Sequence, residues 1–489
     1  MELSVRRHQK LPYLPDWFWL AAIAGALRFV NLGAENFWYD ESFTAWLASR
    51  LPLSNMWQAI QGDVHPPLWY VISFVEAHIF GTSEFALRLP DAILGVVAVV
   101  LVWHIALAVG FQRRVAFVAG LLAAVLPAAI YYSQDARMYP LLAVAVLLTT
   151  WSAIKGRWAL FWLSGTVAVY TQNLGVLYVT ALGIAVLLLR WRDWRSAVRP
   201  MLALVGIVAA WLPWSVVMIH QMQQMSQGFW LQPMTPGGLL WPLAEMTVGW
   251  RSPESLQIDI YGVALGLTAV GLIAGRRWLV SRQGIIILAA MIGAPVLTGL
   301  ASLIWRSVYL PRAMLPSVLL LMLPWAYVLE CLSRPNRRVA RLIVIPALAV
   351  ALVAQYEPAQ GGREDVRDWL EPVRAGWQSG DVIFHTALHT AILYGYYLPG
   401  LDYEIRPSVS DLNESLSEDT KRAMQFRQAQ FDDLRSLGYK RAWLLVYTNP
   451  MSRIDEYKEV ARITTTYRNL LIRAKDNQFA SERIYLVTL

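Results

Sequence analysis

The stretch that decides how this chain is organised reads Asn36-Phe37-Trp38-Tyr39-Asp40-Glu41-Ser42, just beyond an apolar segment from Trp17 to Val30. The apolar segment has the character of a membrane span, which needs roughly 20 residues, or fewer when its ends are anchored. An acidic pair at a membrane surface is costly to keep and contributes little to packing. Asp40 and Glu41 are therefore candidates for holding or deprotonating a substrate. The competing interpretation is a solvated helix N-terminus before Ser42 to Ala48.

Composition places the chain among membrane proteins. It is 56% hydrophobic and only 16% charged, with a mean hydropathy of +0.41. Typical soluble domains carry about 25% charged residues. The charge is unevenly spread, because residues 357–489 hold 36 of the 76 charged residues. We therefore predict a transmembrane domain over residues 1–356 and a soluble domain over residues 357–489.

Eleven apolar segments are candidates to cross about 30 Å of hydrocarbon. They lie near residues 16–33, 88–109, 115–131, 138–154, 158–173, 174–189, 200–219, 260–275, 285–304, 313–330 and 342–356. With a cytoplasmic N-terminus, 18 of the 25 Lys and Arg before residue 357 fall in cytoplasmic loops, as the positive-inside rule requires. This bias explains the net charge of +8 without a nucleic-acid partner. Eleven spans place the C-terminal domain on the outer face.

The outer face then carries two long loops, at residues 34–87 and 220–259. Within the first loop, Phe43 to Gln61 and Pro67 to Phe80 are apolar with helical periodicity but short. If Pro67 to Phe80 crossed the membrane, Arg113 and Arg114 would move outside and break the charge pattern. We expect both segments to be helices that lie in the outer interface.

Residues 357–489 predict a small α/β domain. Helical periodicity appears at Glu364 to Ala375 and at Thr386 to Tyr397. Strand-like apolar runs appear at Asp381 to Phe384, Ala442 to Val446 and Ile484 to Val487.

Seven basic residues lie outside the predicted cytoplasmic loops, so the positive-inside rule does not explain them. They are Arg28, Arg50, Arg88, Arg137, Arg251, Arg306 and Arg312. Arg50, Arg88 and Arg251 flank amphipathic segments, where interfacial snorkelling is a competing explanation. Arg137 and Arg312 lie at the outer mouths of spans, where a positive charge suits a phosphate held at the membrane surface.

His65 shares the first outer loop with the acidic pair, and Pro66 and Pro67 restrict the backbone after it. A lone histidine is most often structural, but its place beside Asp40 makes it a candidate ligand of substrate. Acids and a histidine on one face also raise the question of a divalent metal. The sequence supports a metal only weakly, because it has no HExxH, DxD or cysteine cluster. No cofactor is predicted.

Four motifs together resemble those of the GT-C fold glycosyltransferases, over about residues 10–330. The motifs are Tyr39-Asp40-Glu41, Asp63-Val64-His65-Pro66-Pro67-Leu68, Ser133-Gln134-Asp135-Ala136-Arg137-Met138-Tyr139 and Tyr309-Leu310-Pro311-Arg312. The chain looks most like the family 39-like bacterial branch, which is related to protein O-mannosyltransferases and lipid A aminoarabinose transferases. The resemblance implies a polyprenyl-phosphate sugar as donor, used on the outer face of the inner or plasma membrane. The acceptor would be a glycan, lipid or protein.

The site predicted in this way comprises Asp40, Glu41, His65, Arg137, Arg312 and Tyr139. The resemblance makes Asp40 the general base and places His65 and Arg137 where the family contacts donor phosphate. We expect these three side chains to face one outward cavity, with Arg312 and Tyr139 as further phosphate contacts. Glu41 would position substrate or hold the loop. The family often has glutamate in place of Asp135 and a histidine near Gln172-Asn173, and these departures bear on substrate choice.

The residues are also chemically suited to this reaction. A hydroxyl that attacks an anomeric carbon needs a carboxylate to take its proton, and the departing lipid phosphate needs cationic stabilisation. Direct displacement with a single base inverts the anomeric centre. Two other classes stay open at this point: a transporter or flippase of lipid-linked sugars, and a non-catalytic assembly protein. Transporters tend to carry midplane charges and paired broken helices, whereas the ionisable groups here gather at one membrane face.

Overall fold

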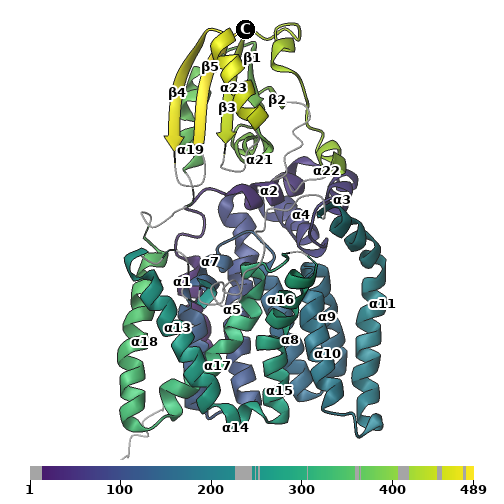
Figure 1. Ribbon diagram of the computed structural model, residues 1–489, viewed down its shortest axis with the longest axis vertical. Coiled ribbons are helices and arrows are strands. Elements are labelled where there is room, and N and C mark those ends of the chain that lie inside the picture. The colour runs from purple at the N-terminus through teal and green to yellow at the C-terminus, as the bar shows by residue number, and fades with distance from the viewer. Residues whose placement is uncertain are drawn as a thin grey trace, which may run out of the picture.

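The computed structural model is a helical bundle with a sheet-containing domain above one end (Figure 1). It describes residues 14–225, 245–247, 249, 251, 254–305, 307–357, 363, 365–405, 418–448, 454–476 and 481–489. The basic residues of the first ten positions, Arg306 and most of the predicted loop 220–259 lie outside these ranges.

Each predicted apolar segment coincides with a helix, or with helices joined end to end, in the described part of the chain. The bundle consists of α1 (Asp16–Phe29), α5 (Glu84–Ala108), α6 (Arg113–Val125), α7 (Pro127–Ser133), α8 (Tyr139–Lys155), α9 (Trp158–Thr171), α10 (Gly175–Leu188), α11 (Trp194–Met225), α13 (Glu254–Ala274), α14 (Arg276–Leu279), α15 (Arg282–Leu288), η2 (Ala289–Gly293), α16 (Ala294–Ile304), η3 (Pro311–Met314), α17 (Leu315–Cys331) and α18 (Arg334–Gln355). Five helical stretches are long and apolar enough to cross a membrane, or six if the bent pair α6–α7 is one span, among the described residues. The protein is thus an integral membrane protein, and the number of eleven spans stays a prediction.

Proline explains the bend between α6 and α7. Pro127 cannot continue the hydrogen bonding of α6 and disfavours helical backbone at the residue before it. Leu126 accordingly has an extended conformation, with φ −66° and ψ 116°, and the two helices meet at 57°. The second helix, α7, leads into the loop that contains Asp135 and Arg137.

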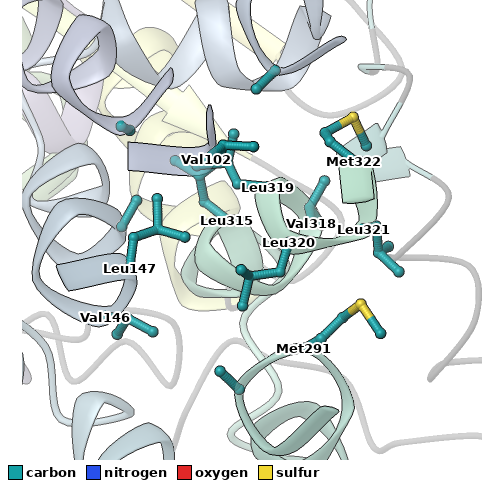
Figure 2. Packing of buried hydrophobic residues seen from close by; sticks show 14 of the residues in the cluster. Val102, Val146, Leu147, Met291, Leu315, Val318, Leu319, Leu320, Leu321 and Met322 are labelled. Atoms are coloured by element: carbon teal, nitrogen blue, oxygen red, sulfur yellow. The ribbon is translucent and has the colours of Figure 1, made fainter. Parts of the chain in front are cut away.

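Helix α17 forms the centre of the bundle. In its apolar stretch, 83% of the residues are buried inside the protein, against 22% for α11 and α18 at the periphery. Figure 2 shows Leu315 and Leu319 of α17 beside Val102 of α5 and Leu147 of α8. A helix that is apolar on all sides is expected in such a central position, because each of its faces contacts another helix.

The basic turns of the bundle lie together at the end away from the sheet domain. Arg113 at the start of α6 pairs with Asp16 of α1 at 2.5 Å, and Arg114 pairs with Glu330 of α17 at 2.9 Å. Arg282 donates to the carbonyl oxygen of Leu189 at 3.2 Å. Figure 1 shows α14 at this same end. These contacts agree with the topology predicted from the charge bias.

Membrane orientation is testable with the single native cysteine. Cys331 is exposed at the basic end of α17, whereas Leu437 of the outer domain is 56% exposed. In intact spheroplasts, a membrane-impermeant maleimide is expected to label Leu437→Cys in a Cys331→Ser background and to leave native Cys331 unlabelled. Labelling of Cys331 with protection at position 437 would reverse the predicted orientation.

Three short helices lie between the bundle and the sheet domain (Figure 1). They are α2 (Tyr39–Arg50), α3 (Leu53–Gln61) and α4 (Leu68–Phe80). The single helix predicted from Phe43 to Gln61 is in fact two, because Pro52 interrupts it. The predicted helix at Pro67 to Phe80 corresponds to α4, and its place agrees with an interfacial position.

The outer domain contains a sheet with the strand order β2-β1-β3-β5-β4 over the described residues. Its strands are β1 (Asp381–His385), β2 (Tyr403–Ile405), β3 (Arg441–Thr448), β4 (Asn469–Asp476) and β5 (Ser481–Thr488). Strand β1 runs parallel to β2 and β3, and β5 runs antiparallel to β3 and β4. Its described helices are α19 (Val366–Trp369), α20 (Glu371–Gly376), α21 (Leu388–Tyr397), α22 (Glu418–Ala423), η4 (Phe431–Asp433) and α23 (Ile454–Thr466).

The sequence predicted this domain incompletely. Strands β1, β3 and β5 and helix α21 were predicted, and β2, β4 and α23 were missed. The helix predicted at Glu364 to Ala375 is broken into α19 and α20 at Leu370, and Pro372 lies in the first turn of α20. Strand β4 lacked a clear signal because its side chains are mostly exposed, so its apolar residues do not alternate cleanly.

The outer domain contacts the interfacial helices through polar and aromatic side chains. The Tyr397 hydroxyl accepts a hydrogen bond from the Phe37 backbone N–H at 2.6 Å and donates to Glu84 at 2.8 Å. Arg50 donates to the carbonyl oxygen of Gly395 at 2.8 Å. The ring of His389 stacks on Tyr39, with centroids 4.9 Å apart. The first outer loop is therefore held from both the bundle and the outer domain.

Candidate active site

The acidic pair occupies the first turn of α2. Helix α2 begins at Tyr39, and the Glu41 carboxylate accepts a hydrogen bond from the Trp38 backbone N–H at 3.3 Å. The helix N-terminus considered as the alternative for this pair is therefore real, but it does not exclude a site. Neighbouring residues on a helix point about 100° apart. Asp40 and Glu41 consequently have very different surroundings.

Glu41 is completely enclosed by protein. Arg88 donates to both of its carboxylate oxygens, at 2.7 and 2.9 Å, and Arg363 lies 2.9 Å from one of them. The Ala136 backbone N–H adds a hydrogen bond of 2.8 Å. Burial works to raise the pKa of Glu41, but the charges of Arg363 and Arg88 outweigh it and lower the pKa below its ordinary value. Glu41 thus holds the loop, the second of the two roles expected for it.

Replacing Glu41 is expected to cost stability. Glu41→Gln removes the charge that compensates two buried guanidinium groups, and breaking a buried ion pair typically costs on the order of 3–5 kcal/mol. The melting temperature in detergent should fall clearly. Asp368→Asn is the control, because its pair with Arg473 is exposed and such pairs contribute about 1 kcal/mol or less. Equal melting temperatures for the two variants would contradict the anchoring role.

Asp40 lies beside two cations and retains access to solvent. Its carboxylate oxygen Oδ2 is 3.0 Å from Arg312 and 3.9 Å from Arg137, and 18% of its side chain is exposed. A carboxylate that is reachable from outside and faces guanidinium groups fits a base that works next to a bound phosphate.

Arg137 is directed mainly at the protein. One of its terminal nitrogens donates to the main-chain oxygen of Asp40 at 3.2 Å and to the Thr44 hydroxyl at 3.1 Å. Its side chain is 3% exposed, and the residue does not line the adjacent cavity. The structure thus brings Arg137 close to Asp40, as expected. Arg137, however, stabilises the backbone at Asp40 and does not face the cavity.

Arg312 is the cation that reaches the cavity. Its guanidinium lies over the rings of Trp38 and Tyr139, 5.3 and 5.4 Å from their centroids, in addition to facing Asp40. Tyr139 is buried and contributes its ring to this arrangement. Arg312, the weaker candidate on sequence grounds, is therefore better placed for a ligand than Arg137.

A cavity of about 230 Å³ opens beside these residues. Its wall is mostly apolar, and it is lined by Val64, His65, Gln172, Asn173, Leu174, Val176, Leu177, Met218, Met222, Ala301, Trp305, Val308, Leu310 and Arg312. Asn173 also donates to the carbonyl oxygen of Val64 at 3.0 Å, which ties the loop after α9 to the loop of His65. The cavity thus combines a mostly apolar wall with the polar side chains of His65, Gln172, Asn173 and Arg312. Of the three side chains expected to face it, only His65 lines it, and Asp40 is linked to it through Arg312.

His65 is buried at this cavity. Its Nδ1 atom has no hydrogen-bond partner among the described residues. Burial, together with the charges of Arg137 and Arg312, lowers the pKa of His65 well below its ordinary value. The imidazole is therefore neutral near pH 7, so it can offer a hydrogen bond to a ligand but no charge.

Sequence reasoning missed three residues that shape the site. Arg88, considered as a snorkelling residue, is 1% exposed and holds Glu41. Trp38 donates to Asp135 at 2.7 Å and carries Arg312 on its ring. Arg363, beyond the last apolar segment, reaches Glu41 and Asp135. A basic residue between two predicted domains has no local pattern that would single it out.

No group of three or more His, Cys, Asp or Glu is arranged to hold a metal ion among the residues that the structure describes.

Comparison with known proteins supports the fold. Residues 64–220 match the family model of dolichyl-phosphate-mannose-protein mannosyltransferases. This range includes His65 and Arg137 but neither Asp40 nor Arg312, whose assignment depends on geometry. No curated protein matches the chain.

Solved structures resemble the chain over almost its whole length. ArnT from Cupriavidus metallidurans bound to undecaprenyl phosphate has a TM-score of 0.62 and 16% identity, covering 96% of this chain and 97% of ArnT. Its apo state gives 0.63 and 15%, with the same coverage. The apo oligosaccharyltransferase of Archaeoglobus fulgidus gives 0.52 and 12%, covering 91% of this chain and 70% of that chain. The chain therefore has the fold of these structures, the GT-C fold, and about a third of it matches the family model of the protein mannosyltransferases.

Proposed function

We propose that this protein transfers a sugar from a polyprenyl-phosphate donor to an acceptor hydroxyl at the outer face of the membrane, with inversion at the anomeric carbon. One observation carries the proposal: Arg312, which lines a mostly apolar cavity together with His65, contacts the Asp40 carboxylate at 3.0 Å. A donor of this class has the same two parts, a charged phosphate and a long hydrocarbon chain. The ArnT structure of similar fold contains undecaprenyl phosphate.

The cavity wall suits a flexible hydrocarbon. Met218, Met222 and Leu177 supply apolar surface, and the thioether side chains adapt to irregular shapes. The chain of the donor would follow this wall while its phosphate meets Arg312 and the free nitrogen of His65. A guanidinium binds phosphate through two parallel hydrogen bonds, and a neutral imidazole adds a third donor.

The reaction then needs one base and no acid. Asp40 accepts the proton of the acceptor hydroxyl as its oxygen attacks the anomeric carbon, and the bond between that carbon and the phosphate oxygen breaks. Polyprenyl phosphate leaves with the bonding electrons and needs cationic stabilisation but no proton. Attack from the face opposite the leaving group inverts the anomeric centre.

The ion pair between Arg312 and Asp40 gives an order to these events. In the absence of donor, the Oδ2 atom of Asp40 is in contact with the Arg312 guanidinium. A bound phosphate competes for Arg312 and so leaves Asp40 free to accept a proton. The base would thus become effective when the donor is in place.

The test has a cellular and a purified part. A deletion strain should accumulate one lipid-linked sugar and lose one outer-face glycan modification, which identifies donor and acceptor. The purified protein, supplied with that donor and acceptor, should release polyprenyl phosphate and form a product of inverted anomeric configuration. An unchanged lipid and glycan profile in the deletion strain, together with no turnover in vitro, would refute the proposal.

A further inference from the structure

The segment that joins α18 to the outer domain carries one side chain deep into the site. Arg363 is 5% exposed, and its terminal nitrogens lie 2.9 Å from the Glu41 carboxylate and 3.1 Å from the Asp135 carboxylate. Its guanidinium also faces the ring of Tyr131, 5.5 Å from the centroid. A residue from outside the bundle is therefore buried among acids of the first outer loop and of the loop between α7 and α8.

Arg363 balances charge in this buried group. The side chains of Glu41 and Asp135 are both 0% exposed, and Arg88 compensates only one negative charge. With Arg363 present, these two buried carboxylates face two guanidinium groups, while the more exposed Glu35, 3.9 Å from Arg363, is paired with Arg251 at 2.9 Å. Without Arg363, one buried carboxylate would lack a counter-charge, which is a strongly unfavourable state away from water.

A chain of contacts connects this group to the reacting residues. Asp135 accepts a hydrogen bond from the indole N–H of Trp38 at 2.7 Å. The Trp38 ring lies under the guanidinium of Arg312, which is 3.0 Å from Asp40. Arg363 does not line the cavity of His65 and Arg312, although it lines a second pocket of about 580 Å³ beside Glu35 and Asn36. It holds the carboxylate that orients the ring beneath Arg312.

We propose that Arg363 is a positioning residue through which the outer domain keeps the transferase site assembled. It neutralises the Glu41–Asp135 pair, and so fixes Trp38, Arg312 and Asp40 in their working arrangement. The inference depends on the proposed function for its kinetic consequence, but its structural part can be tested without substrate.

A charge-balance test separates this role from simple docking. Arg363→Gln should lower kcat by about tenfold or more, the scale on which contacting residues couple, with a smaller change in donor KM. Adding Asp135→Asn removes the excess negative charge and should restore part of the lost turnover. Arg363→Lys, which keeps the charge, should lose less than Arg363→Gln. Arg374→Gln is the matched control, because Arg374 lies in the same part of the chain but pairs with the exposed Glu371.

The second test needs no substrate and follows the melting temperature of the variants as a function of pH. Charged and titratable groups facing Asp135 are Glu41, Asp91, Arg137, Tyr131, Tyr132, Tyr139 and Arg363. Burial and the neighbouring Glu41 raise the pKa of Asp135 to about 6. Because this pKa lies above its value of 3.8 in the unfolded chain, ionisation of Asp135 removes stability as pH rises from about 4 through 6. Loss of Arg363 should enlarge this effect and extend it upward in pH.

The melting temperature of Arg363→Gln should therefore fall further below that of the wild type as pH rises from 5 to 8, and the Asp135→Asn double variant should remove this pH dependence. Arg374→Gln, whose partner Glu371 is exposed, should change the melting temperature little and to the same extent at each pH. Equal behaviour of the two single variants in both arms, or no recovery in the double variant, would overturn the proposal. Absence of transfer by the wild type would refute the function alone and leave the pH arm informative.

Discussion

Asp40→Asn is expected to lower the turnover of sugar transfer by roughly 10²-fold or more, the scale of general-base contributions. The substitution keeps the size of the side chain and much of its hydrogen bonding, but it removes the group that accepts the proton of the acceptor. Because Asp40 is partly exposed, the fold should tolerate the change. The measurement is release of polyprenyl phosphate by purified protein, with the melting temperature recorded in parallel.

Asp402→Asn serves as the control for Asp40, since Asp402 lies in the exposed part of the outer domain and pairs with the exposed Arg427. It should have wild-type turnover. If purified Asp40→Asn also turned over at the wild-type rate, Asp40 would not be the base. The base would then have to be sought among other carboxylates of the outer loops.

Arg312→Gln should cause a loss of similar size. Preorganised groups that stabilise developing charge typically contribute about 10²- to 10³-fold to kcat. Arg312 is the guanidinium that both lines the cavity and faces Asp40, so its removal affects the leaving phosphate and the base together. Arg312→Lys keeps the charge but cannot form two parallel hydrogen bonds, and it should recover only part of the activity. Single-turnover kinetics with the purified donor would measure both losses.

The double variant of Asp40→Asn and Arg312→Gln adds a stricter criterion. Because the two side chains are in contact, their effects should not multiply, and the combined loss should be smaller than the product of the single losses. Arg427→Gln, an exposed arginine of the outer domain, is the matched control and should retain full turnover. Strictly multiplicative losses would show that the two residues act independently, against the geometry.

The architecture of the bundle was largely predictable, because it follows from local properties of the chain. Each apolar segment became a helix, since a backbone in lipid must satisfy its own hydrogen bonds. Two predicted helices are divided at prolines. The chain bends at Pro127, and Pro52 separates α2 from α3. The basic turns share one end of the bundle because successive spans alternate in direction, and the Lys and Arg residues are concentrated in every second loop.

The site was predictable only in outline. Motifs identified Asp40, His65 and Arg312, and the structure brings them to one polar region beside a cavity. The sequence could not predict which of the two arginines is better placed for a ligand. This depends on which guanidinium group donates to the backbone of α2. Arg137 donates to the Asp40 main chain, and this leaves Arg312 for the cavity.

The sequence by itself determined that the chain is a membrane protein with an acidic pair just beyond its first apolar segment. Only the tertiary structure decided that Asp40 stays accessible while Glu41 is enclosed by Arg88 and Arg363. The reason is physical. Apolar periodicity is a property of residues close together in the sequence. The pairing of buried charges depends instead on which distant segments pack together and exclude water.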